Sequence, residues 1–110
     1  RYVFEFRDPS WFGAETEALL KEYGASFCIY DLKGSLSPVA VTADFVYIRL
    51  HGPSAEAYQG RYGRQALSGW AGRMSSWARS ELDVYCYFDN DQKGYAALNA
   101  LELQEMLRGD

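Results

Sequence analysis

The sequence predicts an α/β domain in which four parallel strands alternate with helices. Short apolar runs with period-two alternation recur along the chain, stretches with helical spacing lie between them, and turn residues separate the two kinds of segment. Strands that alternate with helices imply parallel pairing through right-handed crossovers. Four strands are too few to close a barrel, and aromatic edge strands invite pairing with other chains. Half of a larger α/β domain therefore explains the pattern best.

The N-terminal half of the chain predicts three strands and one helix. Residues 2–7 are rich in strand-forming side chains and end at Asp8-Pro9, where proline biases the preceding residue away from helix. Residues 15–23 have apolar side chains at helical spacing and stop before Gly24, a common C-terminal cap. The second strand is predicted at residues 26–31 and the third at residues 45–51. Between them, residues 33–38 are predicted to form a loop because they contain turn residues.

The C-terminal half predicts a long loop, two helices and a fourth strand. Residues 52–63 have no consistent period and are interpreted as a surface loop, and long ordered loops are often functional. In the helix predicted over residues 65–79, one apolar face indicates a core stripe of Leu67, Trp70, Met74 and Trp77. Residues 84–88 form the fourth strand. The last helix is predicted over residues 95–108. The side chains that we expect to face the core are Ala96, Ala100, Leu103 and Leu107.

The composition fits one packed domain or part of one. The chain has 110 residues, of which 48% are hydrophobic and 16% aromatic, and this excludes intrinsic disorder. Eleven Lys and Arg against fifteen Asp and Glu give a formal net charge of −4. That balance disfavours a broad electrostatic grip on nucleic acid and leaves room for a local basic pocket. Because the first residue is Arg1 rather than Met, we expect a fragment, with a single partial domain over residues 1–110.

Several features predict a cytoplasmic protein without a membrane partner. No apolar run approaches the roughly 20 residues of a membrane helix, and residues 1–4 lack the shape of a signal peptide. Cys28 and Cys86 each lie in an apolar, strand-like run. Such positions suit the buried thiols of a reducing cytosol better than a disulfide framework.

The third strand separates its side chains into two faces. Its aliphatic side chains point one way, while Arg49 and His51 share the other face. The first strand shows the same division, with Glu5 and Arg7 opposite the aromatic side chains. Charged side chains therefore share one face near the ends of these strands.

The strand ends are candidates for a ligand site. Asp31 ends the second strand and Asp89 follows the fourth, so every strand finishes in charge. Because an unpaired buried charge is costly, these side chains must be paired, hydrated or bound to a ligand, and the carboxyl ends of parallel strands are the usual ligand site of α/β folds. Guanidinium groups suit carboxylate or phosphate, and His51, with an ordinary pKa near about 6.5, suits proton transfer. The alternative is a structural ion-pair layer, for instance between Glu5 and Arg49.

Residues 89–94 imitate the start of a calcium-binding loop. The imitation fails because Lys93 occupies an oxygen-ligand position and Ala100 stands where a bidentate Glu is needed. We interpret the segment as a strand-to-helix turn whose amides face an anion near Gly94, with Asn90 at the mouth. An ordinary acidic turn that caps the helix is the alternative. The sequence shows no zinc spacing, phosphate-binding glycine loop or Ser/His/Asp signature.

Three further motifs occur in order along nearly the whole chain. They are FEFRDPSWF at residues 4–12, YIRLHG at 47–52 with YQGRY at 58–62, and YFDND at 87–91 with Gly94 and Asn99-Ala100. Together they resemble the YecE-like family, also called domain of unknown function 72 (DUF72). The resemblance implies a TIM-type (β/α)8 barrel, of which this chain is the second half, with strands five to eight. The chain departs from the family pattern at Asp89, where Asn is usual, and at residues 63–65, where an acidic stretch is usual.

The resemblance also carries candidate site residues onto this chain. It brings no established activity with it, so the reaction and any cofactor stay unknown. Glu5 and His51 are the candidates for catalysis by proton transfer. The candidates for substrate binding are Arg7, Trp11, Asp31, Arg49, Tyr58, Tyr62 and Asn90.

Two functions follow from these candidates. The first is an enzyme or binding protein for a small anionic or polyhydroxylated substrate at the carboxyl ends of the strands, with acid/base chemistry. The alternative is a non-catalytic phosphate or nucleic-acid binding module whose stacking surfaces are Tyr58, Tyr62 and Trp11. A metal could be held by Glu5, His51 and Asp31. The open sheet edges also predict self-association of a truncated piece.

Overall fold

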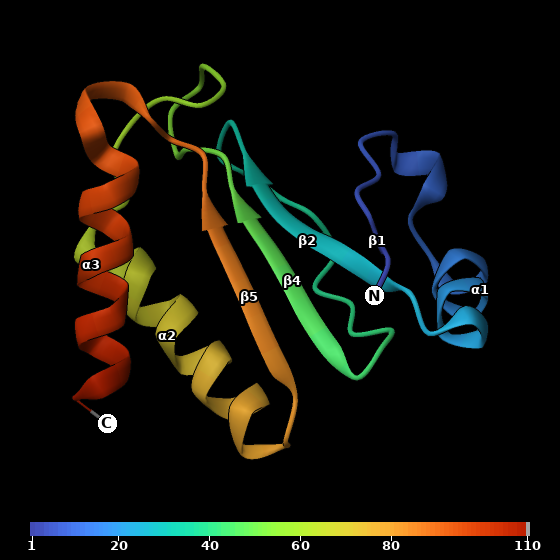
Figure 1. Cartoon of the computed structure of the whole chain (residues 1–110). Coiled ribbons are helices and arrows are strands. Elements are labelled where there is room, and N and C mark those ends of the chain that lie inside the picture. Colours follow the sequence, from blue (N-terminus) through green and yellow to red (C-terminus); the bar gives the residue numbers. More distant parts are fainter. Residues whose placement is uncertain (110) are drawn as a thin grey trace.

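The computed structural model describes residues 1–109, which build a sheet with helices packed on it (Figure 1). The helices are α1 (Ala14–Tyr23), α2 (Arg64–Arg79) and α3 (Tyr95–Arg108). The strands are β1 (Val3–Phe4), β2 (Ser26–Leu32), β3 (Ser35–Leu36), β4 (Phe45–Leu50) and β5 (Asp83–Phe88). Two short 3₁₀ turns, η1 (Pro9–Trp11) and η2 (Gln92–Gly94), precede α1 and α3.

The sheet confirms the predicted α/β fold with four parallel strands. Its order is β1-β2-β4-β5, with every neighbour parallel, and β3 is added antiparallel to β2. In this register Arg49 lies between Tyr30 of β2 and Tyr87 of β5. Because the strands are parallel, their carboxyl ends meet at one edge of the sheet, where the arrowheads point in Figure 1.

The connection from β2 to β4 departs from strict strand–helix alternation. Residues 33–44, all of them described, contain β3 and an extended segment instead of a helix. Side-chain hydroxyls tie this segment to β2, since Tyr30 N donates to Ser37 Oγ and Phe27 N donates to Thr42 Oγ1, both at 2.9 Å. The hydroxyls thus satisfy backbone groups of β2 that a neighbouring strand would otherwise have to satisfy.

Strand β1 is shorter than predicted. It covers Val3–Phe4 rather than residues 2–7, and its register joins Val3 to Ser26 and Phe4 to Phe27. Further along β2, the backbone N–H and C=O of Tyr30 are both bonded to Ser37. The segment after β3 therefore occupies the edge of β2 along which a longer β1 would have to pair.

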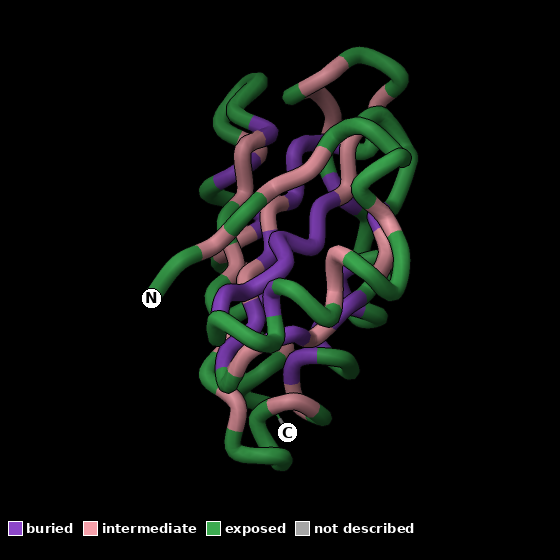
Figure 2. The backbone as a smooth tube through the Cα atoms, turned by 90° about the vertical axis from the view of Figure 1, so that its right-hand side faces the viewer, coloured by how far each residue is buried: buried purple, intermediate pink, exposed green. Residues whose placement is uncertain are grey.

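The main core lies between the sheet and helices α2 and α3. Its strand side is formed by Ile29, Val46, Ile48 and Leu50, and its helix side is formed by Leu67, Trp70, Met74 and Leu103. A smaller cluster joins α1 to the sheet through Leu20 and Phe27. Figure 2 shows the buried backbone in the centre, with exposed segments around it. The core stripe predicted for α2 is confirmed, with Trp77 only partly buried.

The prediction that the Leu107 side chain of α3 faces the core is wrong. This side chain is 37% exposed, and Met106 packs on the main core instead. Leu107 lines a hollow beside Val84 and Cys86 of β5, the last strand of the sheet.

Neither cysteine is in a disulfide. Cys28 is a fully buried free thiol, and Cys86 is a free thiol that is partly buried. Burial raises the pKa of Cys86 to about 12, so its thiol stays protonated at neutral pH. Across residues 1–109, none of the helices has the length and apolar character that crossing a membrane requires.

Candidate functional site

Four charged side chains form a row at the carboxyl ends of the strands, which we call the charged row. It consists of Arg7, Glu5, Arg49 and Asp89 in that spatial order. Arg7 contacts Glu5 Oε2 through Nε and Nη2, and Arg49 Nη1 lies 3.2 Å from Glu5 Oε1. On its other side, Arg49 Nε and Nη2 lie 3.0 and 2.9 Å from Asp89 Oδ2. The row therefore alternates in charge from the end of β1 to the end of β5.

His51 lies fully buried behind the charged row. Its Nε2 is 3.4 Å from both carboxylate oxygens of Glu5, and its Nδ1 is 3.2 Å from Asp89 Oδ2. Burial lowers the pKa of His51 and outweighs the two carboxylates, which act in the opposite direction. The ring is therefore neutral at pH 7. A neutral ring that donates from Nε2 to Glu5 leaves a lone pair on Nδ1, and this atom makes no hydrogen bond among the described residues.

Glu5 is the centre of the site. Burial acts to raise its pKa, but the hydrogen bonds from Arg7 and Cys28 and the nearby positive charges lower it overall. Cys28 Sγ donates to Glu5 Oε1 at 3.4 Å, and burial beside this carboxylate raises the pKa of the thiol. Glu5 is thus an ionised acceptor that is held in place from several sides.

The loop of residues 52–63 brings Tyr58 onto the site. Gly52 has φ +126°, and a Cβ there would lie 2.3 Å from Gln59 O, so only glycine fits this close turn. Tyr58 meets the ring of His51 edge to face, with 5.3 Å between centroids. Burial acts to lower the pKa of Arg7, but the nearby Tyr58 and Glu5 side chains raise it overall. Tyr58 therefore covers the buried histidine and reaches the end of the charged row.

Two buried asparagines hold this loop against the sheet and α3. Asn90 Nδ2 donates to Gly60 O and to Asn99 Oδ1, both at 2.9 Å. Asn99 also accepts from Tyr62 N and donates to Tyr62 O, again at 2.9 Å. Both asparagines are fully buried. We call Asn90, Asn99 and the Tyr62 backbone the loop clamp.

The structure brings only some of the predicted site residues together. Those that meet in one cluster are Glu5, Arg7, Arg49, His51 and Tyr58. Asn90 belongs to the loop clamp and does not lie at the open mouth of an anion site, as was predicted. The turn that follows it makes a second contact with the loop, in which Gly60 N donates to Gln92 Oε1. Trp11 is half-exposed and stacked on Phe6, outside the cluster.

Tyr62 and Asp31 lie beneath the loop. Tyr62 is 2% exposed, and its hydroxyl accepts a hydrogen bond from Gly52 N at 2.9 Å. Burial raises the pKa of Asp31, although the Tyr62 hydroxyl and His51 act in the opposite direction. With its ring enclosed, Tyr62 offers no stacking surface to a nucleic acid.

Sequence reasoning named Asp89 among the charged strand ends without making it a candidate site residue, and it missed Cys28. Asp89 pairs with Arg49, and Cys28 donates to Glu5. The alternation of Tyr85, Tyr87 and Asp89 already places Asp89 on the face of Arg49, so this residue had a usable signal. Cys28 had a weaker signal in the sequence, because a cysteine in an apolar strand is usually only part of the core.

The residues described here do not assemble a metal site. Across residues 1–109, no three His, Cys, Asp or Glu side chains are grouped so that they could hold a metal ion, and the candidate set Glu5, His51 and Asp31 does not form such a group. A cavity of about 310 Å³ adjoins the charged row, lined by Arg1, Val3, Glu5, Cys28, Tyr47 and Arg49.

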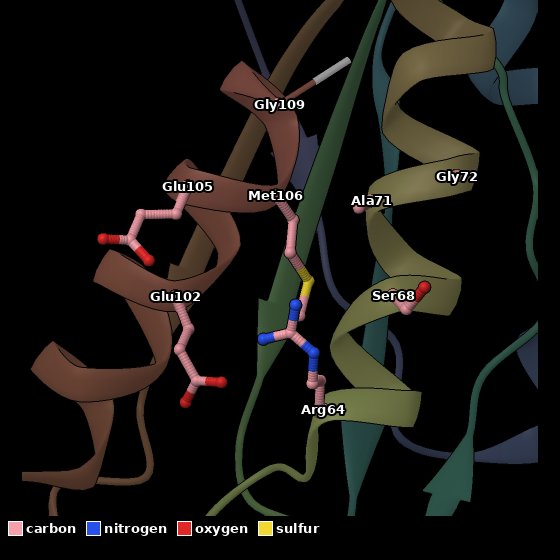
Figure 3. A pocket seen from close by; sticks show the side chains of 8 residues that line it. All are labelled: Arg64, Ser68, Ala71, Gly72, Glu102, Glu105, Met106 and Gly109. Carbon is pink, nitrogen blue, oxygen red and sulfur yellow. The ribbon is translucent and has the colours of Figure 1, made fainter.

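A larger hollow lies on the helical side of the molecule. Its volume is about 570 Å³, and Figure 3 shows Arg64 and Met106 between α2 and α3. Glu102 and Glu105 project from α3 beside it. The strand ends contribute none of its described lining residues, so its chemistry is separate from that of the charged row.

Fold and site together define a parallel α/β protein with a charged cluster at its strand ends. The family model described as "Protein of unknown function DUF72" matches residues 1–110. The chain belongs to this family. A search of curated proteins found no match.

Solved structures of this family share the fold. A DUF72 family protein from Thermotoga maritima (TM1631) is 32% identical with a TM-score of 0.84, and the match covers 96% of this chain and 45% of that one. Two structures of a DUF72 family protein from Enterococcus faecalis (EF0366) are 23% and 24% identical, with TM-scores of 0.84 and 0.79. Each match covers 96% of this chain, and the two matches cover 46% and 48% of the Enterococcus faecalis chains. This chain thus spans about half of each neighbour and is a partial domain of the TIM-barrel-like α/β fold.

Proposed function

We propose that the charged row binds a small anionic or polyhydroxylated ligand at the carboxyl ends of the strands, with acid/base chemistry at Glu5. The observation that carries this proposal is the convergence of four charged side chains and a buried histidine on one site from the ends of β1, β4 and β5. Ligand sites of α/β folds lie at this place.

The outer faces of the two arginines in the charged row are open in this half of the domain. The Arg7 and Arg49 side chains are 45% and 36% exposed, so each guanidinium keeps an outer face in contact with solvent. The exposed faces support contact with a ligand, because Arg presents several donors in a fixed fork.

The proposed proton transfer gives Glu5 and His51 different roles. The Glu5 side chain is 15% exposed, whereas His51 has no exposed surface. A ligand hydroxyl therefore meets Glu5 first and donates a hydrogen bond to a Glu5 carboxylate oxygen, which can take the proton as the hydroxyl oxygen reacts, while Arg7 and Arg49 stabilise the negative charge that develops on that oxygen. His51 holds the carboxylate through Nε2 and acts as a positioning residue.

We also propose that the protein is cytoplasmic, because both of its cysteines are free thiols, as is usual in a reducing compartment.

A thermal-shift screen of the full-length protein tests this proposal. The ligands are inorganic phosphate, sugar phosphates, nucleotides and neutral sugars, and the variants are Arg49→Ala and, as a control, Arg79→Ala at the exposed end of α2. Binding at 100 times Kd adds about 2.7 kcal/mol of stability, so a Tm rise is expected. The rise should vanish in Arg49→Ala and persist in Arg79→Ala. No shift with any ligand, together with strong destabilisation by Arg49→Ala, would assign the row to structure.

A further inference from the structure

We propose that the ligand of the charged row is an uncharged polyhydroxylated ring, such as a sugar, rather than an anion. This inference rests on the proposed function and narrows its ligand class. It follows from the pairing of the arginines, from the aromatic side chains on the same face and from the way the charged and aromatic side chains adjoin.

The arginines on this face are already paired with carboxylates. Arg1 lies 2.9 Å from Asp83 Oδ2, while Arg7 and Arg49 are paired within the charged row. The row holds two guanidinium groups and two carboxylates, so its formal charge is zero while His51 is neutral. An anion on Arg49 would lie beside Glu5 and Asp89, which already contact that guanidinium, and the repulsion would oppose the attraction.

A hydroxyl group fits the same row without this conflict. It can donate to a carboxylate and accept from a guanidinium at the same time. Adjacent pairs in the row offer both partners side by side, since Arg49 Nη1 and Glu5 Oε1 lie 3.2 Å apart. Neighbouring hydroxyls on one ring would therefore each find a donor and an acceptor. Hydrogen bonds to ionised partners are also the stronger ones.

Aromatic side chains lie on the same face as the charged row. Tyr47, Tyr85 and Tyr87 alternate with core side chains along β4 and β5, and the ring centroids of Tyr47 and Tyr87 lie 5.2 Å apart. Their rings offer an apolar surface that matches the C–H face of a sugar ring. Phosphate has no such face.

The charged and the aromatic side chains adjoin on this face of the sheet. The cavity of about 310 Å³ is lined by Glu5, Arg49 and Tyr47, and the adjoining hollow of about 130 Å³ is lined by Tyr47, Tyr85 and Tyr87. Both share Tyr47, so charged and aromatic surfaces meet in one place. Small-molecule sites combine apolar walls with a few polar groups in this way.

Isothermal titration calorimetry on the full-length protein tests this inference. The probes are D-glucose, D-xylose and myo-inositol against inorganic phosphate and glucose 6-phosphate, at low and high NaCl. We expect a neutral probe to bind at least about tenfold more tightly than inorganic phosphate. Its Kd should change less than about twofold with salt, because no net charge is neutralised on binding.

Two tyrosine variants connect the result to this face. Tyr87→Leu should weaken binding of the neutral probe by about three- to tenfold, as expected for a lost aromatic contact. Tyr23→Leu, which replaces a tyrosine that is 74% exposed on α1, should leave binding unchanged. An equal loss in both variants would contradict the inference.

The outcomes separate this inference from the proposed function. Tight phosphate binding that Arg49→Ala abolishes, with no binding of neutral probes, would overturn the sugar assignment and keep the ligand site. Absence of binding for all five probes would count against both. Binding of a neutral probe that Arg49→Ala abolishes would support both.

Discussion

His51 Nε2 lies 3.4 Å from both carboxylate oxygens of Glu5, although the two residues are 46 positions apart in the chain. The contact joins the end of β4 to the segment that follows β1, across β2. It places a neutral, buried ring behind an ionised carboxylate whose other partners are two arginines and a thiol. This pair anchors the charged row.

Replacing Glu5 should destabilise the protein at neutral pH. We expect Glu5→Gln to lower the free energy of unfolding by about 1–3 kcal/mol at pH 7, because Arg7, Arg49 and His51 lose a charged partner. Urea denaturation measures this value, with the exposed Glu22→Gln as a control.

The effect of Glu5 should depend on pH. Its pKa is lowered in the folded state, so its contribution is present above the ordinary value near 4.5 and is lost as the pH falls through the folded pKa. Wild type and Glu5→Gln should therefore converge in stability at low pH. A gap that stays constant from pH 7 to pH 3 would refute this assignment of charge.

His51 should titrate below its ordinary value. Because burial lowers its pKa, the imidazole NMR signals should give a value under 6.5, with the assignment made by comparison with His51→Gln. Stability should fall as the pH drops below about 6.5, since the unfolded chain takes up a proton that the buried ring does not. A value above 6.5 would show that Glu5 and Asp89 outweigh burial.

The loop clamp should control the order of the loop. We expect Asn99→Ala to cost about 1–3 kcal/mol, because the buried N–H and C=O of Tyr62 lose their partner. Amide hydrogen exchange over residues 52–63 should speed up, while Gln104→Ala, at an exposed amide of α3, leaves it unchanged. Unchanged exchange in Asn99→Ala would mean that the loop is held by other contacts.

Residues 1–110 produced alone should self-associate. The β1 edge carries an apolar hollow of about 280 Å³ that is lined by Phe4, Phe6, Leu19, Leu20, Tyr23 and Ala25. An open edge with such a surface favours pairing with another chain. Sedimentation velocity should show species larger than a monomer, and Phe4→Glu should reduce them more than Leu101→Glu on α3. A monodisperse monomer would contradict this expectation.

Most of the fold and the centre of the site follow from period-two alternation. That pattern separates Arg49 and His51 from Val46, Ile48 and Leu50, and the structure keeps the two groups on opposite faces. Parallel pairing then brings the strand ends together. Local spacing thus predicts which side chains share a face and at which end of the sheet they gather.

Contacts between distant segments are what the sequence could not predict. The role of Asn90 depends on Asn99 and on the loop backbone, which only the folded chain brings together. Asn90 was therefore predicted to bind a ligand, although it holds the loop in place. Likewise, the extent of β1 depends on Ser37, which occupies the edge of β2. Side-chain type and spacing carry little information about either contact.

A crystal structure of the full-length protein with the ligand that gives the largest Tm rise tests the central claim most directly. We predict ligand density within hydrogen-bond distance of Arg49 and Glu5, with a ring face against Tyr47 or Tyr87. Density elsewhere, for instance in the hollow between α2 and α3, with the charged row left in contact only with solvent, would contradict the assignment of the site.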